Sequence, residues 1–292
     1  METGTSIITP SIRHTDGGFS KAEAQFCHVS FQVEPDGFSF AILDIRTNEY
    51  RMLESYEWDD LQNEYQLATR IKNLIDQHEQ LRYPFASASA TLYSSYTTLV
   101  PSPLFKEENA IDYAAFNMRL LPGDQVSYDA LSQTDCNNVY IDNDVVKDAL
   151  LTYFSNLTSK HPSTILIESL LRDYKQDSEP QVTIHVSPSH FEIIVITNGN
   201  LMFHNSFMHK TGEDYGFYLL YVCDQLNLDR DFISLQLVGE IEVKSSMYEI
   251  TQKYIRKISF GLRPADYHYH NLFADLPKHY HYNLFNQARC VL

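Results

Sequence analysis

The chain has 292 residues, 43% of them hydrophobic and 21% charged, which is typical of a folded protein with enough apolar residues for two cores. Its formal net charge of -16 disfavours a general nucleic-acid binder, because a phosphate backbone would be repelled. No apolar run reaches the roughly 20 residues of a membrane helix, and no apolar secretion signal opens the chain, so we expect a cytoplasmic protein without membrane insertion.

The first predicted elements follow a polar N-terminal segment. Residues 1–25 have few periodic apolar positions, and we expect them to form a flexible tail. Two alternating apolar runs, 27–33 and 38–44, flank Pro35-Asp36-Gly37, and Asp-Gly between such runs is typical of a β-hairpin. The pattern then predicts a strand at 50–56, a helix that includes 65–75, and extended segments at 86–93 and 96–100.

The middle of the chain reads as helical up to a polar boundary. Helices are predicted at 107–121, 143–154 and 163–174, with an irregular segment at 122–137 and a short strand at 139–141. The polar segment 175–180 ends in a Pro and forms the best internal boundary. We therefore expect a tail at 1–25, a first subdomain at 26–178 and a second subdomain at 179–292.

The second half repeats the start of the first. VSFQVEPDGFSFAILD at 29–44 aligns with VTIHVSPSHFEIIVIT at 182–197 at a constant offset of 153. A third strand (201–207), a helix (213–226), a strand (232–238), a helix (245–256) and a strand (257–262) are predicted to follow. Each half thus reads β-β-β-α-β-α, and a repeat of a whole unit at a fixed offset indicates duplicated domains with helices packed on mixed sheets.

This duplicated order resembles the actin-like ATPase superfamily, which includes sugar kinases, Hsp70-type chaperones and actin-like cell-division proteins. FQVEPDGFSFAILD at 31–44 also looks like the opening of a bacterial family, domain of unknown function 3822, found in Bacteroidetes. The resemblance implies an α/β fold of two duplicated actin-like, ribonuclease H-like subdomains with a cleft between them. In the superfamily ATP binds in that cleft, whereas the uncharacterised family implies a fold and no activity.

The resemblance also points to the residues that would hold a nucleotide. Active members carry a phosphate loop of the type DxG followed by Thr or Ser in each hairpin, and Asp36, Gly37 and Ser39 match it in part. An ordinary hairpin turn is the favoured interpretation of these residues. The second hairpin has neither Gly nor Asp between Ser187 and His190. Gly239 alone stands where the superfamily has a Gly pair for adenosine, and a turn at a strand end also accounts for it.

Four histidines near the C-terminus form two HxH pairs, at His268 and His270 and at His279 and His281. Alternate residues of a strand share a face, so each pair could direct two imidazoles at one metal ion. Solvated histidines on exposed strands are the favoured alternative, because the spacing matches no known class of metal site.

Taken together, these features predict a non-catalytic binding or scaffolding module whose partner is another protein, with no nucleic acid and no cofactor. A divergent ATP-binding kinase or ATPase that uses Mg²⁺, Asp36, Gly37, Ser39 and Gly239 is the alternative. A metal-binding protein that uses the C-terminal histidines is the second alternative.

Overall fold

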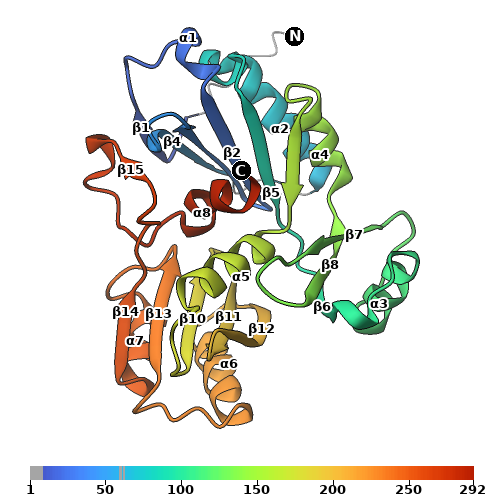
Figure 1. Cartoon of the computed structure of the whole chain (residues 1–292), viewed down its shortest axis with the longest axis vertical. Coiled ribbons are helices and arrows are strands. Elements are labelled where there is room, and N and C mark those ends of the chain that lie inside the picture. The colour runs from blue at the N-terminus through green and yellow to red at the C-terminus, as the bar shows by residue number, and fades with distance from the viewer. Residues whose placement is uncertain (1–8, 59–60, 62) are drawn as a thin grey trace.

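The computed structural model describes residues 9–58, 61 and 63–292, and its two largest sheets share one strand arrangement (Figure 1). Five neighbouring strands of the first sheet lie in the order β4-β3-β2-β5-β9, and the second sheet has the order β12-β11-β10-β13-β14. In each, three antiparallel strands are extended by two parallel ones. The strands of the first sheet are β2 (Cys27–Glu34), β3 (Gly37–Asp44), β4 (Glu49–Glu57), β5 (Ser87–Leu92) and β9 (Leu157–Lys160). Those of the second are β10 (Gln181–Val186), β11 (His190–Thr197), β12 (Asn200–Met208), β13 (Ser234–Gly239) and β14 (Lys257–Phe260).

The repeated residues pair in the same register in both sheets. Val33 pairs with Phe38 in the first hairpin, and at the offset of 153 Val186 pairs with Phe191 in the second. A register shift also interrupts both sheets at corresponding positions, between Ile42 and Leu43 and between Val195 and Ile196. Because register and irregularities are conserved features of a sheet, this correspondence is the arrangement expected of two copies of one unit.

Helices cover the outer face of each sheet. Helices α2 (Glu64–Gln77) and α4 (Asp144–Leu151) pack on the first sheet, and α6 (Gly212–Gln225) and α7 (Ser246–Tyr254) pack on the second. The apolar faces of α2 and α6 recur at helical spacing, with Leu67, Ile71 and Leu74 buried in α2 and Tyr215, Leu219 and Val222 buried in α6.

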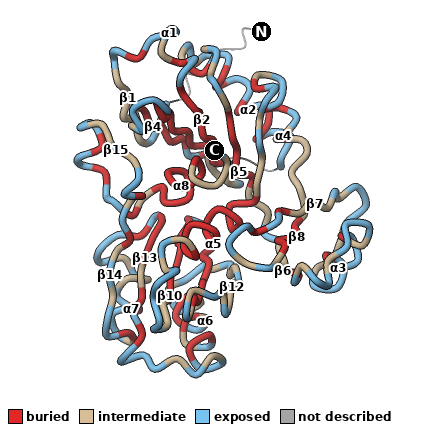
Figure 2. Tube along the Cα trace, in the orientation of Figure 1, coloured by how far each residue is buried: buried red, intermediate tan, exposed pale blue. Residues whose placement is uncertain are grey.

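Two further helices lie between the sheets, and Figure 2 shows both as buried tubes. Helix α5 (Pro162–Asp173) ends the first half but packs against β11 and β12 of the second sheet. Helix α8 (Tyr282–Val291) ends the second half but packs against β2, β3 and β5 of the first sheet. The two helices also contact each other. Each half therefore supplies the helix that covers the inner face of the other half's sheet.

A third sheet is inserted between β5 and α4, and here the structure corrects the sequence analysis. Its order is β6-β8-β7, with β6 (Thr97–Pro101), β7 (Gln125–Ala130) and β8 (Cys136–Asp142). The helix predicted at 107–121 is shorter than expected. It consists of a 3-10 turn, η3 (Glu107–Asn109), followed by α3 (Ala110–Asn117), and another 3-10 turn, η2 (Ser102–Leu104), precedes it. Strand β7 lies inside the segment predicted to be irregular. One face carries Gln125, Ser127 and Asp129, and the other carries Val126, Tyr128 and Ala130, so the strand has a short alternation that the sequence analysis overlooked.

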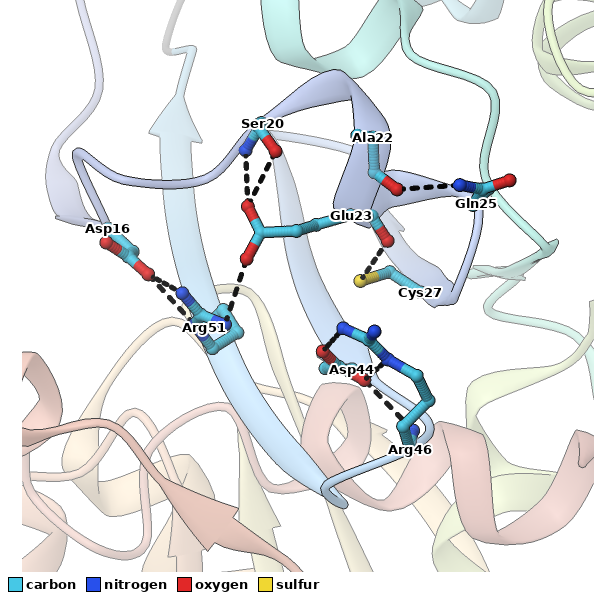
Figure 3. A network of polar contacts seen from close by, with 9 residues as sticks. All are labelled: Asp16, Ser20, Ala22, Glu23, Gln25, Cys27, Asp44, Arg46 and Arg51. Carbon is cyan, nitrogen blue, oxygen red and sulfur yellow. Dashed lines mark hydrogen bonds and ion pairs between the residues drawn. The ribbon is translucent and has the colours of Figure 1, made fainter.

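The N-terminal segment is also more ordered than predicted, within residues 9–25. Strand β1 (Ile12–Thr15) pairs antiparallel with β4, and α1 (Lys21–Ala24) follows it. Figure 3 shows why the segment is held: Arg51 of β4 forms ion pairs with Asp16 and Glu23, and Glu23 Oε2 accepts hydrogen bonds from Ser20 at 2.8 and 2.9 Å. The expectation of a tail failed here because the partner of Asp16 lies on a strand 35 residues away in sequence. The remaining expected tail, residues 1–8, lies outside the described residues.

The C-terminal segment returns to the first sheet, although the sequence analysis assigned it to the second subdomain. Strand β15 (His268–Tyr269) pairs parallel with β4, and the 3-10 turn η4 (Asn271–Phe273) leads towards α8. The Tyr50 hydroxyl donates a 2.9 Å hydrogen bond to the carbonyl of Phe285 in α8. In the first half, a short 3-10 helix, η1 (Glu79–Arg82), directly follows α2. None of the helices in the described part of the chain combines the length and the apolar character that a membrane crossing requires.

Candidate functional site

A small pocket lies where the two halves meet, beside the turn of the first hairpin. Its volume is about 100 Å³, whereas sites for drug-sized ligands usually have about 300–1,000 Å³. Strands β2, β3 and β4 supply most of the lining, and the second half adds Pro188 and Glu240. We refer to it as the interdomain pocket.

The structure brings Asp36, Gly37 and Ser39 together at this pocket, as three residues of one hairpin. Their groups are engaged within the sheet. The Asp36 carbonyl accepts a 2.7 Å hydrogen bond from the Trp58 N–H, and the Ser39 hydroxyl is 2.6 Å from the Ser55 hydroxyl. Gly37 pairs with residues on both neighbouring strands, and a Cβ there would lie 3.0 Å from the Tyr56 carbonyl oxygen. The packing of the hairpin thus accounts for the glycine.

Gly239 lies at the end of β13 with a φ of +86°, a conformation that favours glycine. Its N–H donates a 2.8 Å hydrogen bond to the carbonyl of His279, and an added Cβ would collide with the carbonyl oxygen of Val186. The C-terminal segment therefore accepts the hydrogen bond of the Gly239 N–H, and the close packing on Val186 accounts for the glycine.

The four C-terminal histidines have different surroundings. His268 is exposed on β15, and the ring of His270 accepts a hydrogen bond from the N–H of Leu272 at the start of η4. The ring of His279 is 2.8 Å from the Ile241 carbonyl, while burial lowers the pKa of His281 to about 4. In the described part of the chain, no group of three His, Cys, Asp or Glu side chains is arranged to hold a metal ion.

The second hairpin also contacts the first half directly. His190, at the start of β11, is buried, and its ring stacks on that of Tyr93 with centroids 4.0 Å apart. Tyr93 follows β5 in the first half, where its N–H donates to the Val33 carbonyl. Burial lowers the pKa of His190 to about 3, so the ring is neutral in this contact at neutral pH.

A buried polar cluster lies next to this stack, around Glu192 of β11. His204 Nε2 donates a 2.7 Å hydrogen bond to Glu192 Oε2, the Ser163 hydroxyl donates to the same oxygen, and His185 Nδ1 lies 3.9 Å from Oε1. Burial alone would raise the pKa of Glu192, but the hydrogen bond and the nearby imidazoles outweigh it and hold that pKa below its usual value. Because Ser163 lies in the first turn of α5, this cluster fixes α5 on the second sheet.

The interdomain pocket is strongly acidic. Four carboxyl groups line it, from Glu34, Asp36, Glu57 and Glu240, and none of the described residues in its lining is Lys, Arg or His. Burial raises the pKa of Glu34 well above its usual value, and the charges of Asp36, Glu192 and Glu240 raise it further against a hydrogen bond from Gln32. Burial, followed by the charges of Glu57 and Asp36, raises the pKa of Glu240 to about 7. A bound cation would lower both raised pKa values, so the pocket favours cations over anions.

The sequence analysis did not identify Tyr93, Glu192 or Glu240 as members of this region. One signal was available for Glu192, because a single carboxylate in the apolar run 191–196 calls for a buried partner. It also stands where the repeat places Ser39 in the first copy. For Glu240 and Tyr93 the sequence offers no such signal.

Comparisons with known proteins support the fold. A family model described as "Protein of unknown function (DUF3822)" matches residues 16–258. A solved structure from Bacteroides thetaiotaomicron VPI-5482, described as having an actin-like ATPase fold and unknown function, aligns with a TM-score of 0.76 and 23% identity over 84% of this chain and 94% of that one. A chain of the PilM-PilN type IV pilus biogenesis complex aligns with a TM-score of 0.60 and 11% identity over 94% and 100% of the two chains. A comparison with curated proteins found no match.

Proposed function

Since the chain belongs to the DUF3822 family of proteins of unknown function and has an actin-like ATPase fold, we propose that it is a non-catalytic binding or scaffolding module for another protein. In this proposal the two halves keep the fold of an ATPase but do not bind ATP. The protein acts through its surface rather than by turnover.

The observation that carries this proposal is the acidity of the small interdomain pocket. The first hairpin turn contributes Asp36 to it, beside the carboxyl groups of Glu34, Glu57 and Glu240. Phosphate groups placed there without a metal ion would meet like charge, and no Lys or Arg among the described lining residues offsets it. In the second half, the backbone N–H of Gly239 already donates to the His279 carbonyl, and this also supports a protein that does not bind ATP.

Two further observations support a protein partner. The structurally similar PilM-PilN protein is itself part of a complex, which gives a precedent for this fold in assembly. The inserted unit around the third sheet also exposes large apolar side chains, namely Leu104, Ile111, Phe116 and Leu121. Exposed apolar residues that gather on one unit are typical of interaction surfaces.

Titration calorimetry with ATP and Mg²⁺ tests the proposal. We expect no binding heat from the full-length protein and none from the Asp36→Ala variant. Micromolar affinity for ATP that is lost in Asp36→Ala would contradict the proposal and favour the ATP-binding alternative. A parallel phosphate-release assay should give the same rate with and without the protein.

A further inference from the structure

The interdomain pocket contains buried acceptor atoms as well as charge. Gln32 is only 9% exposed, and its Nε2 donates a 3.2 Å hydrogen bond to Glu34 Oε1. That bond fixes the orientation of both side chains. Gln32 Oε1 and Glu34 Oε2 are then buried without a hydrogen-bond partner among the described residues. Since leaving a buried polar atom without a hydrogen bond costs about 1–3 kcal/mol, two such atoms in one pocket point to a hydrogen-bonding group that comes from outside.

The arrangement of the oxygens distinguishes between kinds of cation. A metal ion requires several ligands that converge on one point, and no three carboxylates or imidazoles in the described residues do so. The acceptors of this pocket are instead spread over β2, β3 and β4 and over Glu240 on the opposite half. A guanidinium group matches such a distribution, because it is planar, always charged and carries five N–H donors that point in different directions.

We propose that the interdomain pocket binds the guanidinium group of an arginine side chain that a protein partner inserts between the two halves. Gln32 Oε1 accepts one hydrogen bond, Glu34 releases its proton to solvent as the cation binds and then accepts another, and Glu240 closes on the cation from the second half. The volume of about 100 Å³ suits the end of one side chain. This inference rests on the proposed function and deepens it, because it gives the chemistry of the partner.

The charge of the pocket supports this assignment. The raised pKa values of Glu34 and Glu240 follow in part from the mutual repulsion of their neighbours, as described above. A bound cation lowers the energy of every ionised carboxylate around it. Binding of arginine should therefore weaken as salt is added, because screening reduces the attraction.

The only tryptophan of the chain provides a direct reporter of binding. Trp58 follows β4, and its backbone N–H donates a hydrogen bond to the Asp36 carbonyl. Its indole ring stacks on the ring of Phe38, with centroids 6.4 Å apart. Asp36 and Phe38 both line the pocket. The fluorescence of Trp58 should therefore change when the pocket is filled.

The experiment titrates the full-length protein with the peptide Gly-Arg-Gly and, as a neutral control of the same shape, with Gly-citrulline-Gly. It is performed at about pH 8, one unit above the pKa of about 7 of Glu240, so that this group is ionised. We expect a saturable change in Trp58 fluorescence with the arginine peptide and a Kd at least about tenfold higher with the citrulline peptide. The Glu240→Gln variant should bind the arginine peptide several-fold more weakly. Glu179→Gln, an exposed change in the segment between the halves, should bind it like the unaltered protein.

Equal affinity for the two peptides, or an unchanged affinity in Glu240→Gln, would overturn the inference. A saturable response to MgCl₂ or CaCl₂ that competes with the arginine peptide would assign the pocket to a metal ion and would overturn it as well. The ATP titration is performed on the same samples. ATP binding contradicts the proposed function, whereas an absence of both ATP and arginine binding contradicts only this inference.

Discussion

The ring of Tyr93 stacks on the imidazole of His190, with centroids 4.0 Å apart and planes inclined by 28°. One ring follows β5 of the first sheet, and the other opens β11 of the second. Tyr93 lies next to Val33 and Glu34, which belong to the same hairpin as Asp36. The contact therefore joins the two halves beside the interdomain pocket. It is therefore the natural place to test how firmly the two halves are held together.

Replacing Tyr93 with Ala should lower the free energy of unfolding by about 2 kcal/mol, because a half-buried aromatic pair is lost. Tyr93→Phe is the matched control, since it keeps the ring. Among the described residues, the hydroxyl of Tyr93 has only Ser206 as a hydrogen-bonding neighbour, so its removal should cost less than about 1.5 kcal/mol, the usual contribution of one hydrogen bond. Urea unfolding of the three proteins measures both effects. A Phe variant as unstable as the Ala variant would show that the ring stack is not the stabilising contact.

The stability of the protein should fall in acid, in part because of His190. Its pKa is about 3 in the folded protein and about 6.5 when unfolded, so below 6.5 the unfolded chain binds a proton that the folded protein does not. The contribution of neutral His190 is therefore complete above pH 6.5 and is lost as the pH falls. Between pH 8 and pH 5 the loss should be about 2 kcal/mol.

The variant His190→Phe keeps an aromatic ring on Tyr93 and removes the titrating group. The loss of unfolding free energy between pH 8 and pH 5 should be about 2 kcal/mol smaller in this variant than in the unaltered protein. Other buried histidines, such as His28 with a pKa lowered to about 4, contribute equally to both proteins and cancel in the comparison. Parallel pH profiles for the two proteins would contradict the assignment.

Gly239→Ala should strongly destabilise the protein, because the new Cβ would collide with the carbonyl of Val186 at the junction of β10 and β13. Gly123→Ala is a matched control: Gly123 also has a positive φ, of +103°, but nothing lies within 4 Å of the position of its Cβ. The control should lose about 1–2 kcal/mol through backbone strain alone. Gly239→Ala should lose at least about 2 kcal/mol more, as judged by thermal or urea unfolding. Equal losses would mean that the structure around Gly239 relaxes without cost.

Much of the fold could be predicted because its signals are local. Alternating apolar residues indicate strands, and the constant offset of 153 between the two hairpins correctly implied one arrangement in both sheets. Strands β1 and β7 were missed for a matching reason. Both are short strands at the edge of a sheet, and none of their apolar residues is fully buried, so pairing with a neighbouring strand defines them more clearly than their short sequence patterns do.

The candidate site could be predicted only where its residues are neighbours in sequence. Asp36, Gly37 and Ser39 were identified together because they belong to one turn. Glu240 lies some 200 residues from that turn, and its place in the pocket depends on how the halves pack. The assignment of ATP to Asp36, Gly37 and Ser39 stays a prediction for the titration above.

The sequence by itself determined that the order β-β-β-α-β-α occurs twice, since the alternations, turn residues and helical periods that mark each element are local. Only the tertiary structure decided what lies between the two units. Helices α5 and α8, the stack of Tyr93 on His190 and the acidic interdomain pocket all join distant segments. Their contacts depend on shape and burial across an interface, and the period of a sequence pattern carries no information about either.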